Sequence, residues 1–189
     1  MTAWGGRVLL LAVAGALVFP LALATPGEDH DFMPKGGKTL LLEVLGAPPE
    51  MAEFRKIVRA RRTEAEWRAA IAPRGKALTE RQLATLAAYL AVNMPLPDAV
   101  AQEAAKRGEP SSSLPQDGRE LAWKQCQSCH SLFASHLTQI RDVQGWRNMF
   151  MSPFHREMKM SPQEREEFAR YSALNMPMKI EDVPQDLRF

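Results

Sequence analysis

The stretch Trp123–Leu132, WKQCQSCHSL, carries both cysteines of this 189-residue chain and places a histidine directly after the second one. Two thiols at this spacing can form a redox dithiol, supply half of a zinc site, or attach a haem covalently. The surrounding sequence distinguishes these three kinds of site, because each of them requires a different context.

The context favours covalent haem attachment. Structural zinc requires four Cys or His ligands, and only His130 and His136 lie near the two cysteines. A thioredoxin-type dithiol sits in a βαβ unit, whereas the chain after its N-terminal segment shows no strand-like alternation. In C-x-x-C-H, the thiols of Cys126 and Cys129 bond the two vinyl groups of one haem, and the imidazole of His130 binds its iron. The sequence therefore predicts one covalently bound haem c.

The N-terminal segment is typical of a secretory signal peptide. The run Val8–Ala24 contains no charge, follows Arg7, and ends in the A-x-A cleavage pattern Ala22-Leu23-Ala24. We expect residues 1–24 to be removed near Ala24, which leaves no stable membrane span and a protein in the periplasm. An uncleaved anchor is the alternative, because the run of about 17 residues is only slightly shorter than a span.

The charge of the chain is nearly balanced, with 24 Lys and Arg, 22 Asp and Glu, and a formal net charge of +2. This balance predicts no nucleic-acid partner and no polybasic membrane patch. The segment Arg55–Arg68, RKIVRARRTEAEWR, is locally basic. We interpret it as a solvated helix face, with docking of an acidic partner as the alternative.

Two parts of the chain repeat each other. Leu78–Pro97 and Met160–Lys179 align without gaps, which matches Tyr89 with Tyr171 and superposes two Asn-Met-Pro sequences. Each segment opens with an S/T-x-x-E/Q capping box, and each proline disfavours helix in the residue before it. The repeat therefore predicts two equivalent helices, each ending at Asn-Met-Pro.

The repeat continues upstream and predicts the domain organisation. Tryptophans and glycines match in the same order, but the first copy has no cysteine or histidine at the attachment position. We expect an all-α fold of two small helical domains in tandem, produced by duplication. Their predicted boundaries, including a linker whose second half is rich in Pro, Ser and Gly, are 25–100, 101–117 and 118–189.

The segment Gly118–Leu187 resembles a class I c-type cytochrome domain. The matching features are Gly118, the motif Cys126-Gln127-Ser128-Cys129-His130, Trp146 and a capped last helix that carries Tyr171. The resemblance implies that Gly118 and Tyr171 meet where the first and last helices cross. The whole chain is similar in layout to dihaem c-type cytochromes, with the first haem site lost and haem bound only by the second domain.

The resemblance also implies a second axial ligand, usually a methionine in the loop before the last helix. Spacing favours Met151, which with His130 would then coordinate the iron. The position that carries the methionine in many relatives is Pro153 here, and His136 is expected at the surface. The alternative distal ligands are Met149, Met158 and His155.

The function implied by the resemblance is one-electron transfer in the periplasm, not catalysis by the chain alone. The expected partner is a periplasmic redox protein, dehydrogenase or oxidase, for which the chain is a shuttle or the cytochrome subunit. One alternative is a five-coordinate haem domain that binds a small ligand, as a sensor or a catalytic site. Another is a structural subunit in which the haem only stabilises the fold.

Overall fold

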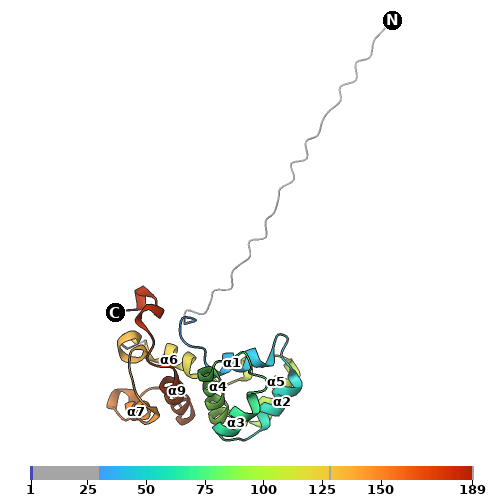
Figure 1. Cartoon of the computed structure of the whole chain (residues 1–189), viewed down its shortest axis with the longest axis horizontal. Helices are drawn as coiled ribbons and strands as arrows, with labels where there is room; N and C mark the ends of the chain where they lie inside the picture. The colour runs from blue at the N-terminus through green and yellow to red at the C-terminus, as the bar shows by residue number, and fades with distance from the viewer. Residues whose placement is uncertain (2–29, 128, 189) are drawn as a thin grey trace.

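The computed structural model describes Met1, residues 30–127 and residues 129–188, and within these residues it is all-helical, with no strand (Figure 1). This confirms the predicted all-α class. The predicted signal peptide, apart from Met1, lies outside the described residues. No helix in the described part is long and apolar enough to cross a membrane.

The helices fall into two groups along the chain, which we call the first half and the second half. The first half consists of α1 (Gly37–Leu45), α2 (Met51–Arg59), α3 (Glu64–Ile71), α4 (Glu80–Asn93) and α5 (Asp98–Arg107). The second half consists of α6 (Gly118–Cys126), the π-helical turn η2 (Phe133–Leu137), α7 (Val143–Met149), α8 (Pro153–Arg156) and α9 (Pro162–Asn175). Short 3₁₀ turns are η1 (Ser111–Ser113), η3 (Ile180–Asp182) and η4 (Gln185–Leu187).

The predicted repeat helices are α4 and α9, each of 14 residues. Both predicted capping boxes are present: the side chains of Thr79 and Ser161 accept hydrogen bonds from the amides of Gln82 and Glu164. A capping box satisfies two otherwise unpaired donors of a helix start, so these four polar residues fix where the helices begin. The local sequence therefore determined both elements.

Two hydrophobic clusters lie one in each half. Trp67 and Tyr89 are fully buried in the first cluster, and Trp146 and Tyr171 are fully buried in the second. The packing around them is parallel: α1 and α3 pack on α4, while α6 and α7 pack on α9. The predicted division into two tandem domains stays a prediction, because the two halves also share extensive contacts.

The segment 101–117, predicted as a linker, belongs in part to the first cluster. Helix α5 carries Ala101 and Ala104 into that cluster, and Leu114 is buried there as well. Only the stretch after α5 has the Pro-Ser-Gly composition on which the prediction rested. Most of this segment is therefore packed structure of the first half.

A glycine allows the closest helix contact in each half. A Cβ added to Gly37 would lie 2.1 Å from the Cβ of Tyr89, and one added to Gly118 would lie 2.1 Å from the Cβ of Tyr171. Two carbons cannot approach so closely, so only glycine permits these crossings. The contact between Gly118 and Tyr171 is the one that the cytochrome resemblance led us to expect.

The two halves pack through α4 and α9, which lie side by side in the middle of the molecule (Figure 1). The hydroxyl of Tyr89 donates to the carbonyl of Pro115 at 2.9 Å, and the hydroxyl of Tyr171 donates to the carbonyl of Pro34 at 2.6 Å. Each tyrosine thus holds the segment that leads into the first helix of the other half. Each half therefore stabilises the start of the other half through an equivalent tyrosine.

A buried polar network joins the two central helices. The side-chain amide of Asn93 donates to Oε2 of Glu167 at 3.1 Å, and the amide of Gly118 donates to Oε1 at 3.1 Å. At the equivalent place on α4, Thr85 Oγ1 accepts from Asn175 Nδ2 at 3.0 Å. Burial raises the pKa of Glu167 to about 8, so its carboxyl is largely protonated at neutral pH.

One carboxylate accepts hydrogen bonds from the first turns of two helices. Asp117 accepts from the amide of Glu120 in α6 at 3.1 Å and from the amide of Lys38 in α1 at 3.1 Å. The N-cap residue of helix α1 is Gly36, which offers no side-chain cap of its own. The second half therefore supplies the cap that the first helix of the first half lacks.

Candidate functional site

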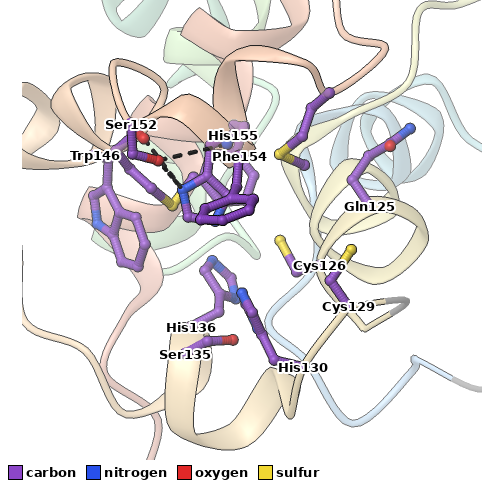
Figure 2. A pocket seen from close by; sticks show the side chains of 13 residues that line it. Gln125, Cys126, Cys129, His130, Ser135, His136, Trp146, Ser152, Phe154 and His155 are labelled. Carbon is purple, nitrogen blue, oxygen red and sulfur yellow. Dashed lines mark hydrogen bonds between the residues drawn. The ribbon is translucent and has the colours of Figure 1, made fainter.

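The second half contains a cavity of about 480 Å³, a size typical of ligand sites, between α6, η2, α7, α8 and α9 (Figure 2). Three of the four predicted site residues line it, namely Cys126, Cys129 and His130. The other lining residues are Gln125, Ser135, His136, Trp146, Met149, Ser152, Phe154, His155, Met158 and Phe168.

Helix α6 brings the first cysteine to the cavity. Cys126 is the last residue of α6 and is buried, whereas Cys129 follows the helix and is exposed. Figure 2 shows both sulfur atoms on one side of the cavity. Burial and the neighbouring Cys129 raise the pKa of the Cys126 thiol to about 12, so this sulfur keeps its proton at neutral pH.

His130 is exposed at the edge of the cavity, and its ring faces that of His155. The two ring centroids lie 6.1 Å apart, with the ring planes at 87°. His155 Nδ1 lies 3.0 Å from Ser152 Oγ and 3.2 Å from the carbonyl oxygen of Met149. Ser152 also caps α8, so the same residue starts the helix and holds the ring.

The structure does not place Met151, the predicted distal ligand, in this cavity. Its side chain is 67% exposed and does not line the cavity. Helix α7 ends at Met149, and the turn that follows, closed by the bond from the Met151 amide to the Asn148 carbonyl, directs the two methionines differently. Met149 lines the cavity, as do the alternatives Met158 and His155.

His136 is buried, although we expected it at the surface. Its Nε2 lies 2.8 Å from Ser172 Oγ, and its ring packs against Trp146 and Phe168 at centroid distances of 5.1 and 5.2 Å. Burial lowers the pKa of His136 to about 3, so the ring is neutral at any physiological pH. The π-helical turn η2 directs the His136 ring toward the interior, and no sequence pattern predicts a π-helical turn.

One residue of the cavity wall, Trp146, carries a buried hydrogen-bond donor that has no partner among the described residues. This donor is the indole Nε1. The guanidinium of Arg141 lies 5.3 Å from the centre of the same indole. Because a buried donor without a partner is costly, a hydrogen-bond acceptor that reached Nε1 would be stabilised there.

These features fit a covalently bound haem. Cys126 and Cys129 offer two thiols, and His130 offers an imidazole. Aromatic side chains supply much of the remaining wall, as an apolar macrocycle requires. Within residues 30–127 and 129–188, no three Cys, His, Asp or Glu side chains are grouped so that they could hold a metal ion by themselves.

The first half has a smaller counterpart of about 290 Å³. It is lined by Trp67, whose buried Nε1 also lacks a partner within the described residues, and the guanidinium of Arg62 lies 5.0 Å from the ring centre. This reproduces the pairing of Arg141 with Trp146. No cysteine or histidine lines this smaller cavity.

Comparisons of the chain with protein-family models, with curated proteins and with solved structures gave no match.

Proposed function

We propose that this chain is an exported electron-transfer protein that carries one covalent haem c in its second half. One observation carries the proposal. The two cysteines and the histidine of C-x-x-C-H line a single cavity, whose wall also includes the fully buried Trp146. Each of these groups also occurs in proteins without haem, but their combination in one cavity matches what a covalently attached haem requires.

The cysteines would hold the group through thioether bonds. In each addition, the sulfur of Cys126 or Cys129 bonds to one carbon of a vinyl group, and the thiol hydrogen passes to the other carbon. No atom leaves, and no oxidant or reductant is consumed.

The remaining side chains would position and shield the group. His130 would bind the iron from the side of the motif. Phe154 and Phe168 would limit the access of water. When bound, the group supplies an iron that accepts one electron from a reduced partner and passes it to an oxidised one.

The setting of this activity follows from the N-terminal sequence. A cleaved signal peptide would deliver the chain to the periplasm, where haem is attached to exported chains. Its partners would be a periplasmic redox protein, dehydrogenase or oxidase. The chain would act as a shuttle or as the cytochrome subunit of such a complex, not as an enzyme by itself.

The test is to express the full chain in a bacterium that matures c-type cytochromes, and to compare it with the variant C126A/C129A. We expect the purified wild type to carry one haem that survives denaturation and to show the reduced spectrum of a haem with two thioether bonds. The double variant should lose the covalent haem completely. Met151→Leu, outside the cavity, is the matched control and should load normally. A wild type without covalent haem, in cells that load a control cytochrome, would overturn the proposal.

A further inference from the structure

We propose that His155 is the second axial ligand of the iron, opposite His130, so that the site is a bis-histidine site. This inference rests on the proposed function, because it concerns the same cavity. It replaces the methionine that the sequence led us to expect, and it starts from the placement of Met151 outside the cavity.

The two imidazoles belong to different walls of the cavity. His130 follows α6, whereas His155 is carried by α8, and both line the space into which the cysteines also open (Figure 2). Two imidazoles on opposite sides of one first-row metal place their bonding nitrogens about 4 Å apart, since each bond is about 2 Å long. The centroid separation of 6.1 Å accommodates this arrangement, because each centroid lies behind its own nitrogen.

The hydrogen bonds of His155 leave the correct nitrogen for a metal. A carbonyl oxygen only accepts and the Ser152 hydroxyl can accept, so the tautomer with the ring proton on Nδ1 is the one that suits both contacts. Nε2 then keeps its lone pair. Histidines that bind metals commonly donate their other ring N–H to a carbonyl or carboxylate in this way, which fixes the tautomer and the ring orientation.

The local sequence explains why a histidine takes this place. Ser152 accepts from the His155 amide as the N-cap, and Pro153 occupies the first turn of α8. The cap thus holds both the backbone and the ring of His155. The thioethers of Met149 and Met158 line the same cavity, but a thioether has no second polar atom through which the protein could orient it.

A second imidazole has a functional consequence. A methionine ligand raises the reduction potential of a haem iron, so its replacement by histidine lowers that potential. The electron donor of this chain would then be a partner of comparably low potential.

The test uses the full chain loaded with covalent haem, in the ferric state. We expect a low-spin spectrum without a methionine–iron charge-transfer band. His155→Ala should lose the low-spin signal, added imidazole should restore it, and His155→Met should gain the methionine band and raise the midpoint potential. Met149→Leu and Met158→Leu are the matched controls and should leave the spectrum unchanged.

Three results would overturn the assignment. A methionine band in the wild type that disappears in a methionine variant would identify that methionine as the ligand and leave the proposed function intact. A high-spin wild type that binds cyanide or carbon monoxide would indicate an open iron and favour a ligand-binding haem domain. A chain without covalent haem would overturn the proposed function as well.

Discussion

The first and second halves share a helical arrangement but differ in the side chains that line their cavities. Both have a glycine–tyrosine crossing, a 14-residue helix with a capping box and a buried tryptophan beneath an arginine. Only the second cavity is lined by cysteine and histidine. The arrangement therefore forms without those side chains. The candidate site is local: its residues come mainly from the end of α6, the segment that follows it, and α8.

The largest expected effect tests whether the glycine–tyrosine crossing is equally essential in the two halves. Gly118→Ala and Gly37→Ala would each drive a Cβ into that of a tyrosine, at 2.1 Å. We expect each change to destabilise the chain by more than about 4 kcal/mol, enough to leave little folded protein. Soluble yield and circular dichroism would show it. Gly108→Ala, where an added Cβ meets nothing within 4 Å but φ is +69°, is a milder control.

The next effect concerns one difference between α4 and α9. Thr85 of α4 stands at the position that Glu167 occupies in α9. The pKa of Glu167 is about 8 in the folded chain against an ordinary 4.5. Between these values the unfolded chain has released a proton that the folded chain still binds, so stability falls as pH rises. We expect the free energy of unfolding to fall by about 3 kcal/mol from about pH 5 to pH 8.

Urea titrations at several pH values would measure this loss. Glu167→Gln, which stays neutral, should remove most of the slope. A smaller slope of the same sign should remain from Asp117, whose pKa is also raised by burial. Thr85→Val is the matched control and should leave the slope unchanged. A slope that persists in full in Glu167→Gln would show that this carboxyl does not carry it.

A smaller effect tests the reciprocal tyrosine bonds. Tyr89→Phe and Tyr171→Phe each remove a hydroxyl that donates to a carbonyl in the other half. We expect each to lower the free energy of unfolding by about 1–2 kcal/mol, because a carbonyl is left without its donor. Both should shift a single cooperative transition. If either variant instead separated the transition into two, the halves would be independent folding units.

The smallest effect compares the caps of the two repeat helices. Thr79→Ala and Ser161→Ala each remove the side-chain acceptor of a first turn. We expect a loss of about 1 kcal/mol in each case, measured by urea unfolding. Similar values would agree with the equivalence of α4 and α9. A much larger loss at Ser161 would show that the second half depends more strongly on its last helix.

The features that the sequence predicted well are local ones. The caps at Thr79 and Ser161 and the ends at Asn-Met-Pro are short-range patterns, and the structure reproduces them. Cys126, Cys129 and His130 reach one cavity because a single helix end carries them. Gly118 and Tyr171 were identified only because a family resemblance supplied their pairing.

The features that the sequence did not predict depend on three-dimensional packing. Met151 and His155 differ in position because of the turn between α7 and α8, which no spacing rule describes. His136 is buried because η2 is a π-helical turn. The hydrogen bonds from Tyr89 to Pro115 and from Tyr171 to Pro34 join residues that are remote in sequence, so no periodicity could reveal them.

The carboxylate of Asp117 has a consequence for how this chain can evolve. It caps α6 and also the first turn of α1, which has no side-chain cap of its own. A gene that encoded only the first half would therefore leave the start of α1 without its cap. A gene that encoded only the second half would keep Asp117 but lose the second helix that it caps. Mutation can erase ligand residues from the first half one at a time, but selection for a stable product retains its helices. The two halves therefore depend on each other at this cap, whichever side chains line the cavity of the first half.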